Sequence, residues 1–252
     1  MSPVLDLPLI IGHRGTAGLA PENTLAGIRR AHEEGASWVE FDVKLTADNI
    51  PILMHDDRLG RTTNGKGKVA DKTLLEIQAL DAGGWFAPDF AGERIPTLRA
   101  TLELCIELGL GVNLELKPCP GREEETAKLA LRMLEEAWPG QLNLPPPLIS
   151  SFDEKALKAA WTLAPDVLRG CLVTRVPGPW KTKLQKYDCS TLNVGNRWIR
   201  KKHVEAATAA GVPVLVYTVN DPERALALWE AGVTSIFTDR VDLMVEALGQ
   251  AR

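Results

Sequence analysis

Acidic, basic and imidazole side chains gather in four short segments of this sequence, three of them in its first quarter. They occur in Gly12-His13-Arg14-Gly15, Val39-Glu40-Phe41-Asp42-Val43, Leu53-Met54-His55-Asp56 and Leu114-Glu115-Leu116-Lys117. Carboxylates can bind a hard divalent cation, arginine can bind an anionic oxygen, and imidazole can transfer protons near neutral pH. Together these residue types predict metal-dependent hydrolysis of a phosphodiester.

The charged residues alternate with apolar ones in two predicted strands. Glu40 and Asp42 are two residues apart in one strand, and Glu115 and Lys117 are two apart in another. Side chains two apart in a strand share a face, so we expect the charged residues to point into the barrel. The side chains that point outward, toward the helices, would be Phe41, Val43, Leu114 and Leu116. Three acids that converge repel one another unless a cation lies between them, and a divalent ion with oxygen ligands would relieve that cost.

A buried ion-pair network is the alternative explanation for these charges. It would join the acids to Arg14 and Lys117, but it leaves two histidines at the same place unexplained. Taken alone, His13 could be a core histidine and His55 a turn residue. An arginine beside a tight glycine turn is suited to binding an oxyanion, which favours a functional site.

Short apolar runs alternate with helical patterns along the chain. Strands are predicted at residues 7–11, 38–45, 112–117, 148–151, 168–174, 191–194, 213–219 and 235–238. A helix follows each strand, the first of them with Asn23 or Thr24 as its cap. Eight such units in 252 residues predict an α/β fold, a closed (β/α)₈ TIM barrel whose active site lies at the carboxyl ends of the strands. A doubly wound open sheet is the alternative, but no GxGxxG follows the first strand and no P-loop is present.

The pattern is interrupted at about residues 57–96, which are rich in turn residues and look helical only at Leu74–Leu80. This stretch is too long for an ordinary connection, so it predicts a small insertion after the second barrel strand. Trp85 and Phe86 would either pin the insertion to the barrel or wall a substrate pocket. We expect His32 and His203, and the basic clusters at 181–186 and 200–202, to lie on solvated helix surfaces.

Bulk composition is that of an ordinary globular protein, with 45% hydrophobic and 25% charged residues. A formal net charge of −4 does not indicate binding to nucleic acid or to an anionic membrane. Met1 to Ile11 lack the pattern of a secretory signal, and no apolar run is long enough for a membrane span. The four cysteines form no CxxC pair, so we expect reduced thiols and a cytoplasmic protein.

The ordered set of motifs resembles the glycerophosphodiester phosphodiesterase family, most closely its short cytosolic bacterial members. Beside the segments above, the resemblance rests on Ala20-Pro21-Glu22-Asn23-Thr24, Arg61-Thr62-Thr63-Asn64-Gly65, Asp81-Ala82-Gly83-Gly84-Trp85-Phe86, Ile95-Pro96-Thr97-Leu98 and Val216-Tyr217-Thr218-Val219-Asn220. It covers nearly the whole chain and implies a single TIM-barrel domain over residues 1–252, with the insertion after strand two.

The resemblance also implies a role for each site residue. The metal ligands would be Glu40, Asp42 and Glu115, with one divalent cation, Mg²⁺ or Ca²⁺ and also Mn²⁺, as cofactor. The acid–base pair would be His13 and His55, with His13 as the base and His55 as the acid. Arg14 and Lys117 would bind the substrate. Tyr217 stands where many members have tryptophan, so its role as a substrate contact, or as a residue that fills the barrel, stays open.

The implied reaction converts an sn-glycero-3-phosphodiester, such as glycerophosphocholine or glycerophosphoethanolamine, to glycerol 3-phosphate and an alcohol. A lysophospholipase D activity, a catalytically silent phosphodiester-binding module and a structural protein on the same scaffold are the alternatives. We expect a small-molecule substrate, no nucleic acid or membrane partner, and a chain that could form a homodimer. The sequence itself leaves open the metal, the alcohol, which histidine is the base, the oligomeric state and whether the insertion acts as a lid.

Overall fold

The computed structural model describes residues 6–138 and 144–250. The expectation that Met1 to Ile11 form no secretory signal falls in part on residues 1–5, which lie outside this range.

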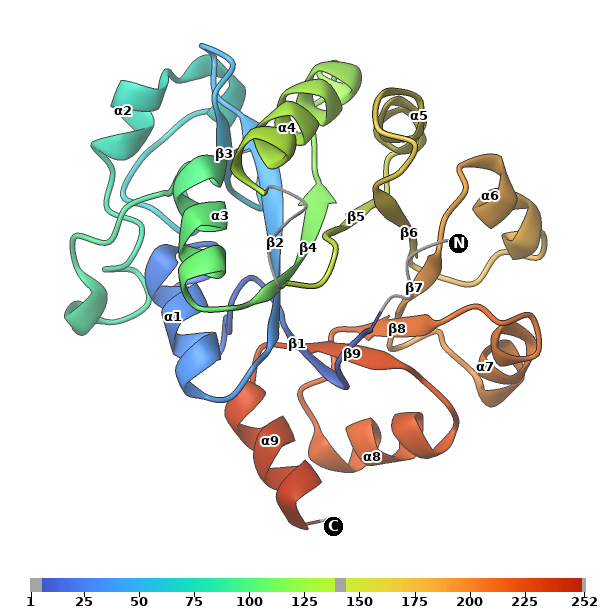
Figure 1. Ribbon diagram of the computed structural model, residues 1–252. Helices are drawn as coiled ribbons and strands as arrows, with labels where there is room; N and C mark the ends of the chain where they lie inside the picture. The colour runs from blue at the N-terminus through green and yellow to red at the C-terminus, as the bar shows by residue number, and fades with distance from the viewer. Residues whose placement is uncertain (1–5, 139–143, 251–252) are drawn as a thin grey trace.

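Eight parallel strands close into a barrel that the helices surround (Figure 1). The strands are β1 (Ile10–Gly12), β2 (Trp38–Leu45), β4 (Gly111–Leu116), β5 (Leu148–Ser151), β6 (Leu168–Val173), β7 (Thr191–Gly195), β8 (Val214–Tyr217) and β9 (Ser235–Thr238). The barrel closes because β1 pairs with both β2 and β9. The predicted TIM barrel is therefore confirmed, and the doubly wound open sheet is excluded.

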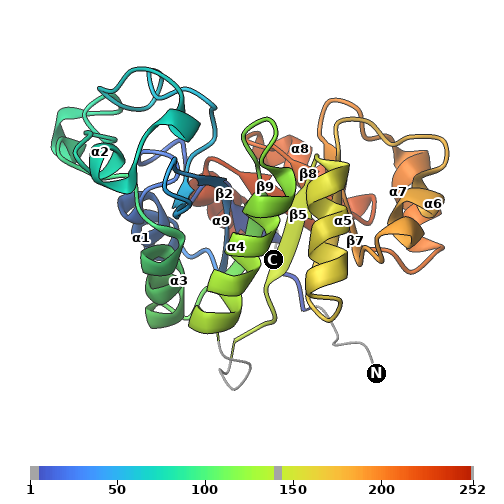
Figure 2. The same ribbon diagram turned by 90° about the horizontal axis from the view of Figure 1, so that it is seen from above.

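Helices follow the strands on the outside of the barrel (Figure 2). They are α1 (Leu25–Glu33), α3 (Leu98–Glu107), α4 (Glu123–Ala137), α5 (Glu154–Leu163), α6 (Trp180–Lys186), α7 (Lys201–Thr208), α8 (Pro222–Glu230) and α9 (Val241–Gln250). Thr24 caps α1 by accepting a hydrogen bond from Gly27 N–H, as one of the two predicted caps would. Asn23, the other predicted cap, instead points its side chain at the barrel. In the part of the chain described, no helix is long and apolar enough to cross a membrane.

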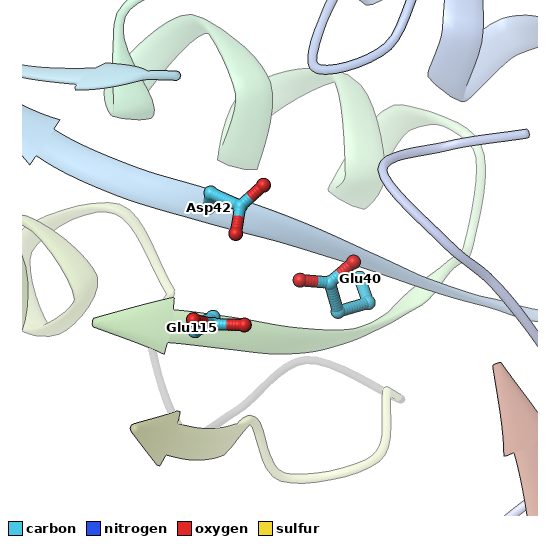
Figure 3. Close-up of side chains that lie close together, drawn as sticks. All are labelled: Glu40, Asp42 and Glu115. Atoms are coloured by element: carbon cyan, nitrogen blue, oxygen red, sulfur yellow. The ribbon is translucent and has the colours of Figure 1, made fainter. Parts of the chain in front are cut away.

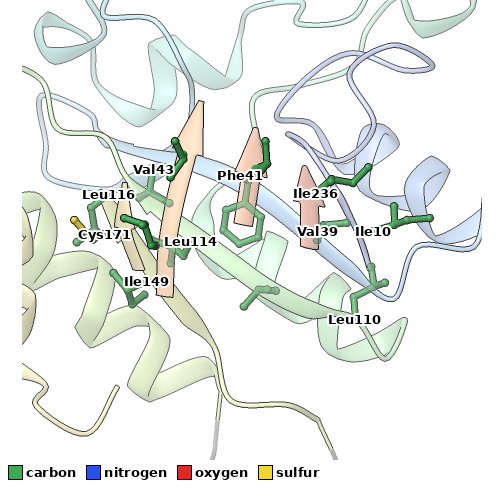
Figure 4. Close-up of a cluster of buried hydrophobic side chains, with 14 of the residues drawn as sticks. Ile10, Val39, Phe41, Val43, Leu110, Leu114, Leu116, Ile149, Cys171 and Ile236 are labelled. Carbon is green, nitrogen blue, oxygen red and sulfur yellow. The ribbon is translucent and has the colours of Figure 1, made fainter. Parts of the chain in front are cut away.

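Two apolar layers fix the strands, one on each face of the sheet. The outer layer lies between strands and helices and contains the predicted Phe41, Val43, Leu114 and Leu116 (Figure 4). A smaller inner layer fills the barrel toward the amino ends of the strands and contains Ile11, Trp38, Leu148, Leu168, Leu215 and Phe237. Because side chains alternate along each strand, residues two or four further on from this inner layer face the barrel mouth.

The insertion begins beyond β3 (Pro51–Leu53), which pairs antiparallel with β2. It carries η1 (Val69–Asp71), α2 (Leu74–Gln78) and η2 (Pro88–Phe90), and it forms the outlying teal lobe of Figures 1 and 2. Its apolar core contains Met54, Leu59, Val69, Ile77, Ala82 and Ile95, which pack with Ile52 of β3 and with Cys119, a residue that follows β4.

The two aromatic residues singled out in the insertion pack within it. Trp85 and Phe86 meet edge to face at 5.7 Å, and Phe86 meets Phe90 in the same way. The Trp85 indole N–H donates to the Ala82 carbonyl oxygen at 2.8 Å. These contacts brace the insertion's own loop.

Candidate active site

Three carboxylates lie together inside the carboxyl end of the barrel (Figure 3). Glu40 and Asp42 project from β2 and Glu115 from β4, with Asp42 paired in register with Glu115. An oxygen of each carboxylate lies within 4.8 Å of one on each of the others. All three side chains are buried, so the repulsion between them is weakly screened. The three residues could hold a metal ion.

Without a cation, the buried carboxylates of this cluster repel one another, and the pKa values of two of them are raised. Burial, followed by the charges of Asp42 and Glu115, holds the pKa of Glu40 well above its ordinary range. Burial and the Asp42 charge likewise raise the pKa of Glu115 to about 7. Although burial opposes it, the charges of Lys117 and Arg14 hold the pKa of Asp42 below its ordinary range.

Two cations partly compensate the acids, as the ion-pair alternative requires. Lys117 Nζ lies 2.9 Å from Glu115 Oε1 and 3.2 Å from Asp42 Oδ1. Arg14 Nε lies 3.3 Å from Asp42 Oδ2. Glu40 Oε1, however, is buried and has no hydrogen-bond partner among the described residues. An ion-pair network alone therefore leaves one buried carboxylate oxygen unsatisfied, which is costly and which a metal ion would relieve.

Arg14 is held in the left-handed region, with φ of 51°, by the glycine turn that follows β1. This conformation directs its backbone N–H to Glu40 Oε2 at 2.9 Å. A side chain at Gly12 would collide with the Gly15 carbonyl oxygen, so the turn needs glycine there. The guanidinium of Arg14 also donates to Glu22 Oε1 at 2.8 Å. The turn thus fixes both the backbone and the side chain of Arg14 beside the acids.

His13 lies just beyond β1 and is oriented by the end of β9. Its Nδ1 lies 2.7 Å from Asp239 Oδ1, and its Nε2 lies 3.9 Å from Glu40 Oε2. Asn220 orients the aspartate in turn, because its amide Nδ2 donates to Asp239 Oδ2 at 2.7 Å. A carboxylate on Nδ1 leaves Nε2, which faces the acidic cluster, available to exchange a proton.

His55 lies beyond β3, where the insertion begins, and has its own carboxylate. Its Nδ1 lies 2.7 Å from Asp56 Oδ1. Arg61, from the insertion, binds both oxygens of Asp56 and both oxygens of Glu22 at 2.7–2.9 Å. Burial lowers the pKa of His55, although the Asp42 charge opposes this. Unlike His13, His55 shares no hydrogen bond or ion pair with the acids among the described residues.

Tyr217 lines a cavity of about 30 Å³ at the barrel mouth, together with His13, Glu40 and Glu115. Its hydroxyl donates to the Val173 carbonyl oxygen at 2.8 Å, and its ring meets Phe152 edge to face at 5.8 Å. The ring, rather than the hydroxyl, therefore faces the cavity. The two remaining histidines lie away from this site, on α1 and α7 as predicted.

A model of the "Glycerophosphoryl diester phosphodiesterase family" matches residues 13–243. The chain belongs to the glycerophosphoryl diester phosphodiesterase family. The predicted family and the predicted class of enzyme, a phosphoric diester hydrolase, are thereby confirmed.

Named relatives agree with this assignment. The chain is 37% identical to a glycerophosphodiester phosphodiesterase of Caldanaerobacter subterraneus subsp. tengcongensis, over 94% of this chain and 96% of the relative. Among solved structures, a phosphodiesterase of Oleispira antarctica in complex with the product sn-glycerol-3-phosphate superposes with a TM-score of 0.93 at 41% identity, covering 96% of this chain and 97% of the other. A glycerophosphodiester phosphodiesterase of Agrobacterium tumefaciens superposes with a TM-score of 0.81 at 31% identity, covering 95% and 100%.

The sequence did not reveal which residues orient His13. Asp239 and Asn220 follow β9 and β8, and both are more than 200 residues from His13 along the chain. Barrel closure brings them together, so the signal in the sequence was a polar residue shortly past a strand end and, for Asn220, its place in a quoted motif. Glu22 and Arg61 stood within the quoted motifs, but their joint contact depends on how the insertion folds.

Proposed function

We propose that the chain hydrolyses sn-glycero-3-phosphodiesters to sn-glycerol 3-phosphate and an alcohol, with one divalent cation bound by Glu40, Asp42 and Glu115. The observation that carries the metal site is the buried Glu40 Oε1, which has no hydrogen-bond partner in the described part of the chain and lies beside two further carboxylates. Carboxylate oxygens suit Mg²⁺, Ca²⁺ and Mn²⁺. When bound, the ion would neutralise phosphate charge and stabilise the more highly charged transition state.

The chain's own cations would hold the phosphate beside that ion. Arg14 and Lys117 converge on Asp42 from two sides, so their guanidinium and ammonium groups flank the mouth of the acidic cluster. Arginine can donate two parallel hydrogen bonds to a phosphate, whereas lysine acts as a point charge. The Tyr217 ring would form an apolar wall of the same cavity.

The two histidines would move the protons. In the proposed route, His13 accepts the proton of the glycerol 2-hydroxyl as that oxygen attacks phosphorus. His55 donates a proton to the departing alkoxide, and a cyclic phosphate forms. Water then opens the cyclic phosphate, with the proton roles reversed, and yields glycerol 3-phosphate. Asp239 would stabilise the imidazolium that forms on His13 when it accepts the proton, and Asp56 would stabilise the protonated form of His55 that donates one.

All of these side chains come from one copy of the chain. We therefore propose that residues 1–252 act as a single catalytic domain, in which the insertion contributes Arg61 and the support of His55.

The proposal is tested by incubating the chain with glycerophosphocholine and, separately, with lysophosphatidylcholine, with and without EDTA. Release of glycerol 3-phosphate and choline from glycerophosphocholine, abolished by EDTA and restored by Mg²⁺, Ca²⁺ or Mn²⁺, is the expected result. Preferential cleavage of lysophosphatidylcholine would replace the proposal with a lysophospholipase D activity. Absence of turnover of both would indicate a silent phosphodiester-binding module.

A further inference from the structure

A second, larger cavity adjoins the barrel mouth between α7 and α8. It has a volume of about 1060 Å³ and is lined by the loops that follow β7 and β8 and by the facing sides of both helices. Tyr217 lines both this groove and the small cavity that contains His13, Glu40 and Glu115. The groove and the small cavity therefore meet at Tyr217.

The groove is cationic, although the chain as a whole is acidic. Its lining includes Arg197, Arg200, Lys201 and Arg224, against a single acid, Asp221. Among the described residues, none of the three arginines forms an ion pair with a carboxylate, although most arginines elsewhere in the chain do. In a protein with a net charge of −4, unpaired arginines gathered at one groove create a local field that attracts anions.

The guanidinium groups are held by contacts that leave donors free. Arg197 lies 5.3 Å from the centre of the Trp198 ring, and Arg175 stacks on the same ring at 3.4 Å. Arg224 Nε donates to Asn196 Oδ1 at 2.9 Å, and the Asn196 backbone N–H donates to the Tyr217 carbonyl oxygen. Arginines fixed through a ring face or a single N–H keep their other N–H groups available for an anionic ligand.

We propose that this groove binds the alcohol part of the diester and favours alcohols that carry a further phosphate group. The inference rests on the proposed function, because it assumes that the phosphodiester occupies the catalytic cavity. From that cavity the leaving alcohol must extend outward, and the groove beyond Tyr217 is large enough to hold a sugar or polyol. A phosphate there would meet several guanidinium groups, whereas the quaternary ammonium of choline would meet like charge.

The test compares two substrates that differ by one phosphate: glycerophosphoinositol 4-phosphate and glycerophosphoinositol. For the unmodified chain, we expect kcat/KM to be about tenfold higher for the phosphorylated substrate at low ionic strength, mainly through KM, and the preference to fall as salt is added. In the variant R197Q/R224Q the preference should fall to about twofold or less. The ratio of the two kcat/KM values is the readout, because both arginines line the groove that either alcohol would occupy.

A matched control removes the same charge elsewhere. Lys128 and Lys158 are exposed on α4 and α5, on another side of the barrel, so K128Q/K158Q should retain the preference. The single variant R197Q, at an exposed position, gives a second measurement if the double variant does not fold. Equal kcat/KM for the two substrates in the unmodified chain would overturn the groove proposal and leave the proposed function standing. Failure to turn over either substrate or glycerophosphocholine would instead contradict the proposed function, and with it the groove.

Discussion

At the scale of single residues, the proposed proton transfers depend on how each imidazole is held. His13 and His55 each place Nδ1 2.7 Å from a carboxylate, Asp239 and Asp56 respectively. Both histidines could be predicted from the sequence because each stands in a motif that ends a strand. The role of Asp239 could not be predicted, because it contacts His13 only once the last strand of the barrel has paired with the first.

Asp239 provides a first prediction, as a positioning residue. His13→Ala should lower kcat by orders of magnitude, and Asp239→Asn by about tenfold to a hundredfold, because the imidazolium would lose its stabilising carboxylate. Metal binding and KM should change little in Asp239→Asn, and Asp239→Glu should recover part of kcat. Steady-state kinetics decide the point; a large rise in KM with unchanged kcat would indicate a role in binding instead.

Glu115 provides a second prediction, on stability against pH in the metal-free protein. Its pKa is raised to about 7 in the fold, from an ordinary value of 4.5. Well below pH 4.5, Glu115 is protonated in both the folded and the unfolded chain, so it has no effect on stability there. As the pH rises above 4.5, Glu115 ionises in the unfolded chain but stays protonated in the fold up to about pH 7. The fold therefore loses stability on the order of 1 to 3 kcal/mol across this range of pH.

Thermal melting in EDTA at pH 5 and pH 8 measures this loss. Glu115→Gln should remove much of the decrease in Tm between the two pH values, because its side chain cannot ionise. An exposed control, Glu124→Gln, should retain it. A Tm difference that is the same in Glu115→Gln as in the unmodified chain would show that another group is responsible.

At the scale of elements, the insertion and the barrel meet at Arg61. Its guanidinium binds both Asp56, the partner of His55, and Glu22, the partner of Arg14. One insertion residue therefore contacts the carboxylate partners of both His55 and Arg14. The insertion's existence could be predicted from its turn-rich composition, but this bridge could not, because it depends on contacts between segments that are distant in the sequence.

Arg61→Gln tests this bridge. Two buried or half-buried carboxylates would lose their common partner, so we expect kcat to fall about tenfold or more and the backbone amides of residues 56–66 to exchange hydrogen faster. Arg58→Gln, an exposed arginine of the same insertion without an ion pair among the described residues, should change neither quantity. Normal kcat with faster exchange would restrict Arg61 to a structural role.

At the scale of the whole molecule, the closed barrel converts alternation in sequence into a layered interior. Trp38 lies in the apolar inner layer, whereas Glu40 and Asp42, two and four residues further along the same strand, reach the mouth. This alternation made the barrel and the acidic cluster predictable. The groove between α7 and α8 was not predictable, since the basic residues at 200–202 resembled an ordinary solvated helix face and their common cavity depends on helix placement.

The central claim is that Glu40, Asp42 and Glu115 hold one divalent cation that hydrolysis requires. Isothermal titration of the EDTA-treated chain with Mg²⁺, Ca²⁺ and Mn²⁺, paired with glycerol 3-phosphate release at each metal concentration, tests it most directly. We predict one bound ion per chain, activity that rises with occupancy, and loss of both in Glu40→Gln but not in the exposed control Glu124→Gln. Full activity in excess EDTA, or unchanged metal binding in Glu40→Gln, would contradict the account.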